Sequence, residues 1–189
     1  MNAIARIIVS VVWGLFIAYW IRAAFSVKRT IRREPVFSRS VVLGLVGSGS
    51  ALLFTSVNNN LALRRLLPPN VVIDLMACIS AIAGLVIAIW ARRTLARNWS
   101  ASVTLKEEHE LVRTGPYRFV RHPIYTGFLL MAFASALVPF STRGFWGLFL
   151  IFAGFWYKLR REEELMTAHF GNDYILYKAR VRALIPWIL

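Results

Sequence analysis

The sequence predicts an all-α integral membrane protein with about five transmembrane helices. Of its 189 residues, 58% are hydrophobic, more than ordinary soluble domains contain. Five apolar segments approach or reach the roughly 17 to 25 residues that a helix needs to cross a bilayer. Basic residues gather between these segments, as they do at the ends of membrane helices. The single cysteine, Cys78, excludes a disulfide framework, and we expect it to be a small packing residue.

The five apolar segments occupy residues 3–25, 41–57, 71–91, 123–139 and 144–158. Most of the basic residues near the first segment follow it, the reverse of a secretory signal, so we interpret this segment as a membrane anchor. The sequence LPPN at 67–70 is typical of a turn that restarts a helix. Only VPFSTRG, residues 138–144, separates the last two segments, so we expect them to form an antiparallel hairpin.

The distribution of basic residues predicts the orientation in the membrane. Of the 23 lysines and arginines, all lie in alternate connections and the C-terminal tail except Arg6, Arg64, Arg65 and Arg143. The positive-inside rule then places the N-terminus outside and the C-terminus in the cytoplasm, in what we expect to be a prokaryotic inner membrane. The net charge of +14 is interpreted as attraction to anionic lipid headgroups, and no nucleic-acid partner is expected.

The segment RTGPYRFVRHPIYTGF, residues 113–128, is unusually polar for this chain. Pro123 suits the first turn of a helix, which would place His122 at its mouth and Tyr125 near the same face. An imidazole and a phenol there could bind a polar ligand, and the first N–H groups of the helix favour an anionic one. The alternative is that this segment holds ordinary membrane-flanking arginines and interfacial tyrosines.

The segment KLRREEELM, residues 158–166, places three acids at an end that should be basic. If the helix continues beyond the membrane, one or two of these acids turn toward His122, and a carboxylate there would suit an amino group. Arg160 or Arg161 would suit a substrate carboxylate or phosphate. The alternative is a solvated helix end. The three histidines lack paired metal-ligand spacing, so no metal is expected.

The sequences HELVRTGPYRFVRHPIYTGF and EEELMTAHFGNDYILYKARVRALIP, separated by a helical hairpin, resemble a known group. They are similar to the integral membrane methyltransferases that include isoprenylcysteine carboxyl methyltransferase and phospholipid methyltransferases. The resemblance covers residues 98–186. It implies a single membrane domain, in which residues 1–97 supply three helices and residues 98–189 supply the hairpin, the tail and the site of the cofactor, S-adenosyl-L-methionine.

The resemblance also implies roles for particular residues. Cofactor contacts are implied for His109, Glu110, Leu111, Val112, Tyr117, His122, Pro123, Ile124, Tyr125 and Glu163. This chain has Leu159 where the family has a substrate-binding arginine, so Arg160, with Arg161 beside it, is the candidate for that role. His122, Glu163 and Arg160 are the candidates for catalysis.

The predicted function is methyl transfer from S-adenosylmethionine to a lipophilic acceptor that enters from the bilayer, with the active site on the cytoplasmic side. A carboxylate acceptor is favoured because the sequence contains no obvious dedicated base. An amine acceptor, as in phospholipid N-methylation, would require His122 or a glutamate to take a proton. A further alternative is an NADPH-dependent reductase of the sterol-reductase type, whose C-terminal region resembles this one, and a non-enzymatic membrane scaffold is the last.

Overall fold

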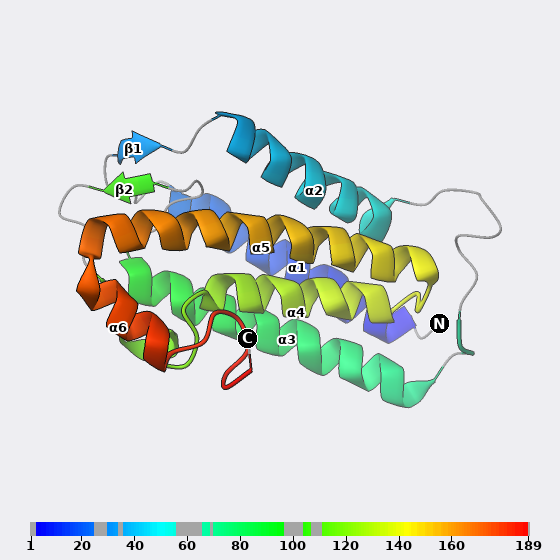
Figure 1. Ribbon diagram of the computed structural model, residues 1–189. Helices are drawn as coiled ribbons and strands as arrows, with labels where there is room; N and C mark the ends of the chain where they lie inside the picture. The colour runs from blue at the N-terminus through cyan, green and yellow to red at the C-terminus, as the bar shows by residue number, and fades with distance from the viewer. Residues whose placement is uncertain are drawn as a thin grey trace.

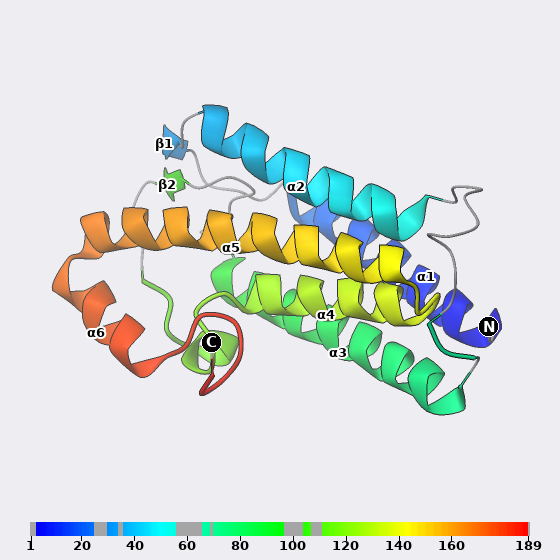
Figure 2. The ribbon, with the colours of Figure 1, turned by 45° about the vertical axis from the view of Figure 1, so that its right-hand side comes forward.

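The computed structural model describes residues 3–24, 30–33, 36–55, 66–68, 70–96, 104–106 and 111–188. Its apolar helices lie side by side (Figure 1), and a view turned by 45° keeps this arrangement (Figure 2). The elements, in chain order, are α1 (Ala3–Ala24), β1 (Thr30–Arg33), α2 (Val36–Phe54), α3 (Val71–Leu95), β2 (Thr104–Lys106), the 3-10 helix η2 (Gly115–Arg118), α4 (Pro123–Leu137), α5 (Thr142–Phe170) and α6 (Asn172–Arg180).

Helical membrane segments account for most of the molecule, as predicted. The helices α1, α2 and α3 are long and apolar enough to cross a membrane, and α4 is a shorter apolar helix. The fifth apolar segment was expected to end near residue 158, but α5 continues to Phe170 with a charged C-terminal part. This extension carries the three consecutive acids beyond the apolar part of the helix.

One departure from the all-α expectation is a short pair of antiparallel strands. Thr30 of β1 pairs with Lys106 of β2, and Arg33 pairs with Thr104. The two strands follow α1 and α3, and they lie together at one end of the bundle (Figure 1). Each strand is only three or four residues long, too short for the period-two pattern by which a strand is recognised in a sequence.

Small residues allow the helices to approach closely. The buried face of α3 consists largely of small residues at helical spacing, namely Ala77, Ala81, Gly84, Ala88 and Ala91. A Cβ atom built on Gly84 would lie 2.5 Å from the carbonyl oxygen of Gly127 in α4, and the reverse distance is also 2.5 Å. Gly49 of α2 and Gly147 of α5 make a similar approach. Small residues serve this purpose in membrane helices.

Not every glycine of α2 lies at such a contact. A Cβ atom built on Gly44 or Gly47 would have nothing within 4 Å.

We expect Gly84→Ala to destabilise the protein by roughly 1–3 kcal/mol, because the added methyl group collides with the backbone of α4. Gly44→Ala provides a matched control, since it adds the same methyl group to a helix in open space and should leave stability unchanged or raise it by up to about 1 kcal/mol. Thermal unfolding of the two variants in detergent would measure the difference. Equal melting temperatures would contradict the close contact between α3 and α4.

Two buried arginines tie together the ends of neighbouring helices. Arg92 in the last turn of α3 donates a hydrogen bond to the carbonyl oxygen of Ala23, at the end of α1, over 2.7 Å. Arg143 at the start of α5 donates to the carbonyl oxygen of Ala51, near the end of α2, over 3.1 Å. The last carbonyls of a helix lack partners within the helix and carry partial negative charge. These arginines therefore stabilise helix ends that lie beside them.

Candidate active site

The C-terminal tail fixes the entry into α4. The backbone N–H of Arg121 donates to the carbonyl oxygen of Arg182 over 2.8 Å, and that of His122 donates to Ala183 over 2.9 Å. The hydroxyl of Thr126 donates to the carbonyl oxygen of Leu184 over 2.7 Å. The helix begins at Pro123, as predicted. The N–H of His122, the residue just before the helix, is thus bound to the tail.

The extension of α5 brings two acids to this entry. Glu162 and Glu163 face α4, whereas Glu164 points outward and pairs with Arg161 over 3.0 Å. Glu163 is only 3% exposed. The expectation that one or two of the three acids turn toward His122 is therefore confirmed.

Three cationic side chains surround the carboxylate of Glu163. Arg121 donates to its Oε1 from Nε over 2.8 Å and from Nη2 over 2.5 Å. His122 Nε2 lies 3.3 Å from the same oxygen, and Lys178 Nζ on α6 lies 2.8 Å from Oε2. A buried carboxylate is stable only when it is paired in this way. Burial raises the pKa of Glu163, but the hydrogen bonds from His122, Lys178 and Arg121 outweigh burial and lower it overall.

His122 lies between two carboxylates. Its Nε2 faces Glu163 over 3.3 Å and its Nδ1 faces Glu162 over 3.5 Å, so both ring nitrogens can donate when the ring is protonated. Burial lowers the pKa of His122, but the hydrogen bonds to Glu162 and Glu163 raise it above its ordinary value. The hydrogen bonds to the two acids thus favour the imidazolium form of the ring.

An aromatic stack continues from His122 into the bundle. The ring of Tyr125 stacks on His122 with centroids 5.5 Å apart and on Phe155 of α5 with centroids 4.8 Å apart. The hydroxyl of Tyr125 donates to Glu162 Oε1 over 2.6 Å. His122 and Tyr125 thus share one face, as their spacing predicted. The stack thus leads from the ion pairs to Phe155 on the facing helix.

The segment before α4 packs against α6. The hydroxyl of Tyr177 donates to the carbonyl oxygen of Tyr117 over 2.5 Å. Burial raises the pKa of Tyr117 well above its usual value, and burial is also the main cause that raises the pKa of Tyr177 to about 12. Both phenols therefore stay neutral at physiological pH and can serve as hydrogen-bond donors.

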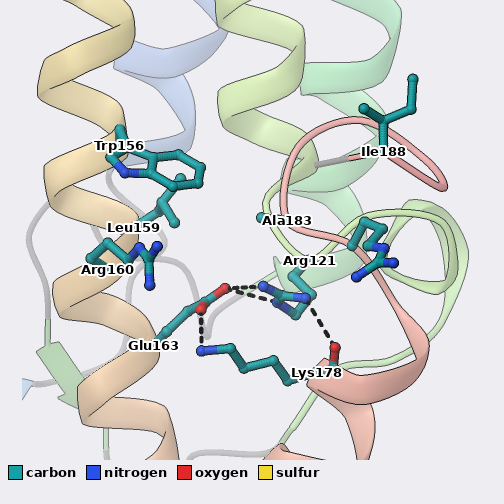
Figure 3. A pocket seen from close by; sticks show the side chains of 9 residues that line it. Arg121, Trp156, Leu159, Arg160, Glu163, Lys178, Ala183 and Ile188 are labelled. Carbon is teal, nitrogen blue, oxygen red and sulfur yellow. Dashed lines mark hydrogen bonds and ion pairs between the residues drawn. The ribbon is translucent and has the colours of Figure 1, made fainter.

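A cavity of about 240 Å³ opens beside Glu163. The side chains of α5 that line it lie on one face of the helix, within two turns. The rest of the lining comes from Arg121, from Lys178 and from the tail (Figure 3). Its lining residues are Arg121, Trp156, Leu159, Arg160, Glu163, Lys178, Arg182, Ala183 and Ile188. The guanidinium of Arg160 lies 5.0 Å from the centre of the Trp156 ring. The cavity is thus lined by apolar side chains together with four cationic ones.

The structure brings many of the sequence-predicted residues to one place. Pro123 is fully buried and Ile124 partly buried in the first turn of α4, and Leu111 and Val112 are partly buried in the segment before η2. His109 and Glu110 lie outside the described residues. Arg161 does not line the cavity; it is exposed and pairs with Glu164.

Sequence reasoning did not assign Arg121, Lys178 or Arg182 to this region, and it did not say which acid besides Glu163 would face His122. Arg121 resembled an ordinary membrane-flanking arginine. Glu162 was recognisable, because it lies seven residues after Phe155 and thus on the same face of α5. Lys178 and Arg182 reach the site only because the chain turns after Gly171 and the tail then returns to the start of α4. No local sequence pattern predicts this path.

Comparison with known proteins gives this arrangement a context. The model of the isoprenylcysteine carboxyl methyltransferase family matches residues 75–168, about half of the chain. A protein-S-isoprenylcysteine O-methyltransferase of Saccharomyces cerevisiae is 34% identical over 118 residues, which are 60% of this chain and 48% of the yeast protein. Methanethiol S-methyltransferase 1 of Bradyrhizobium diazoefficiens is 40% identical over 76 residues, 38% of this chain and 24% of that protein.

A solved structure shares the fold. It is described as the eukaryotic intramembrane Ras methyltransferase ICMT, and it matches with a TM-score of 0.51 at 19% identity, covering 84% of this chain and 55% of its own. This chain thus spans about half the length of the yeast relative and of the solved structure. The family match includes α4 and nearly all of α5, and with them His122 and Glu163. The chain belongs to the isoprenylcysteine carboxyl methyltransferase family.

Proposed function

We propose that this protein transfers a methyl group from S-adenosylmethionine to the carboxylate of a lipophilic acceptor. The observation that carries this proposal is the buried carboxylate of Glu163, which already binds a primary ammonium group, that of Lys178, over 2.8 Å. The amino acid part of S-adenosylmethionine carries an ammonium group of the same kind. Family membership supports the reaction class.

The residues present fit this cofactor. Glu163 would hold its ammonium group in place of Lys178, whose side chain is 43% exposed and therefore free to move away. The stack of His122, Tyr125 and Phe155 begins next to that carboxylate and would offer aromatic contacts to the rest of the cofactor. Leu111, Val112, Tyr117, Pro123 and Ile124 lie in or next to the segment that leads to these rings. When bound, the cofactor supplies a methyl group on a positively charged sulfur.

The titratable groups favour an acceptor that is already ionised. His122 has a raised pKa between two acids, and the pKa values of Glu162 and Glu163 are lowered overall, although burial opposes this, so the hydrogen bonds among the three favour their charged forms. A carboxylate is ionised at neutral pH and needs no base, whereas an amine or a thiol must lose a proton before it attacks. The main tasks of the protein are then to orient the two reactants and to exclude water.

The membrane topology is part of the proposal. Five spans, an outer N-terminus and a cytoplasmic C-terminus would place Glu163 at the cytoplasmic face of an inner membrane. In support, the N-terminus and the α6 region lie at opposite ends of the bundle (Figure 1). The basic connections after α1 and α3 meet at the α6 end through β1 and β2. Anionic headgroups at that face would neutralise part of the net charge of +14.

Calorimetric titration of the detergent-purified protein tests the cofactor. S-adenosylhomocysteine, the product-like ligand, should give saturable heat at one site per chain, and NADPH titrated in parallel should give none. Saturable binding of NADPH alone would overturn the proposal in favour of a reductase. The absence of saturable heat with both ligands would also contradict it.

A further inference from the structure

The tail after α6 carries an exposed apolar surface. Ile185, Trp187 and Ile188 are 46%, 87% and 77% exposed. Among the residues that the structure describes, Trp187 is the most exposed of the large apolar side chains. Neighbouring apolar side chains that face outward mark a surface that interacts with a partner or a membrane.

The backbone of this segment turns Trp187 outward. The N–H of Ile188 donates to the carbonyl oxygen of Ile185 over 3.2 Å, which closes a turn with Pro186 and Trp187 at its centre. We call residues 185–188 the tail turn. Trp187 has a φ of 65°, a conformation that glycine adopts readily and a bulky residue only at a cost. Packing within the described part of the chain does not offset this cost, because the ring is exposed. This favours a contact outside the protein.

The tail turn lies where an apolar helix begins. The backbone N–H of His122 donates to the carbonyl oxygen of Ala183, so the tail runs beside the residue that precedes α4. Figure 3 shows Ile188 on the side of Arg121 that faces the helix bundle, whereas Lys178 of α6 lies on the opposite side. The apolar side chains of the turn are therefore placed at the boundary of the apolar bundle, where the aromatic residues of membrane proteins gather.

Two arginines accompany this surface. Val120 and Arg182 form a parallel bridge, and Arg118 and Arg180 each stand two residues before a bridged residue. Because the bridge is parallel, the chain enters it from the same direction on both strands. Arg118 and Arg180 are both exposed and lie outside the cavity lining. Exposed arginines next to exposed apolar side chains are complementary to a bilayer with anionic headgroups.

The tail also holds the start of α4. The N–H groups of Arg121 and His122 and the hydroxyl of Thr126 all donate to carbonyl oxygens of the tail. The acceptors belong to residues 182–184, directly before the tail turn. Any contact that restrains the turn therefore also restrains the segment that carries Arg121 and His122 to Glu163.

We infer that the tail turn inserts into the bilayer interface beside α4, with anionic headgroups at Arg118 and Arg180, and that this contact holds the start of α4 in place. The partner is a lipid surface, because the turn combines exposed apolar side chains with nearby positive charge at the edge of the apolar bundle. The inference goes beyond the proposed function, since it concerns neither the methyl donor nor the acceptor.

Fluorescence in lipid nanodiscs locates the tail turn. Subtracting the emission of a Trp187→Phe variant from that of the wild type isolates the emission of Trp187. In nanodiscs of phosphatidylglycerol, lipids with brominated acyl chains should quench this emission strongly, and acrylamide in the water should quench it weakly. Strong quenching by acrylamide alone would place the turn in water. Shielding from both quenchers would indicate a protein partner or a second copy of the chain, and either result would overturn the inference.

Hydrogen exchange in the same nanodiscs measures the effect on α4. Trp187→Ser should speed exchange of the N–H groups of Arg121 and His122 by about tenfold, because the tail is then less restrained. Trp187→Gly should do the same, whereas a purely conformational role for this position predicts slower or unchanged exchange, since glycine suits a φ of 65°. Trp146→Ser is the matched control: it removes a 59% exposed ring near the start of α5, far from the tail, and should leave both rates unchanged.

The lipid composition tests the part played by charge. Replacing phosphatidylglycerol by phosphatidylcholine should speed exchange at Arg121 and His122 by roughly fivefold. The double variant Arg118→Gln/Arg180→Gln should exchange at the same rate in both lipids. Equal rates in the wild type and Trp187→Ser, or an equal increase with Trp146→Ser, would overturn the inference. These measurements use neither cofactor nor acceptor, so their outcome is independent of the methyltransferase proposal.

Discussion

Glu163→Gln is expected to abolish binding of S-adenosylhomocysteine and to destabilise the protein. Glutamine keeps the size of the side chain but leaves Arg121, His122 and Lys178 without their shared carboxylate. Removing one partner of a buried ion pair typically costs about 3–5 kcal/mol, because the remaining charges are left uncompensated. A loss of affinity of at least about 100-fold, measured by calorimetry, and a lower melting temperature in detergent are the expected results.

Glu164→Gln is the matched control for this variant. Glu164 is the next residue on the same helix, but its side chain is exposed and its partner Arg161 is also exposed. Exposed pairs contribute little to stability, so both affinity and melting temperature should stay close to those of the wild type. Retained cofactor binding in the Glu163 variant, or an equal loss in both variants, would contradict the site.

His122→Gln is expected to weaken the same site, and the loss should depend on pH. The substitution removes the positive ring between Glu162 and Glu163 and its stacking on Tyr125. The free energy of unfolding should fall by roughly 2–4 kcal/mol near pH 6. His169→Gln, at an exposed position late in α5, is the matched control and should have little effect.

The sign of the pH dependence follows from the pKa directions. The pKa of His122 is raised above the ordinary value of 6.5, so its contribution is fully present below pH 6.5 and is lost as the pH rises through the folded-state pKa. The pKa of Glu163 is lowered from 4.5, so its contribution is present above pH 4.5 and is lost as the pH falls through the folded-state value. The free energy of unfolding of the wild type should therefore exceed that of His122→Gln most clearly between about pH 4.5 and pH 6.5. A gap that grows steadily from pH 7 to 9 would contradict this account.

The sequence predicted the parts of the site that depend on local rules. The start of α4 follows from Pro123, which has no N–H to lose in a first turn. The approach of Glu163 to His122 follows from the short connection between α4 and α5, since a hairpin must bring its open ends together. Helix spacing then places Tyr125 beside His122. Each step uses residues that are close in sequence or joined by one tight turn.

The sequence did not predict the parts that depend on the return of the tail and on the pairing of helices. Lys178 and Arg182 enter the site because α6 folds back after Gly171 and the tail then pairs with Val120. The close contact of α3 with α4 depends on Gly84 and Gly127, which are single glycines in separate helices. Small residues recur at helical spacing along α3, but this spacing does not indicate which helix packs against them.

Transfer of a labelled methyl group tests the central claim most directly. Purified protein in lipid nanodiscs would be incubated with S-adenosylmethionine labelled at its methyl group and with N-acetyl-S-farnesylcysteine, and the volatile methanol released by alkali would be counted. The expected result is label that alkali releases, as a methyl ester requires, which disappears with Glu163→Gln and persists with Glu164→Gln. The absence of transfer, or label that resists alkali, would contradict methyl transfer to a carboxylate.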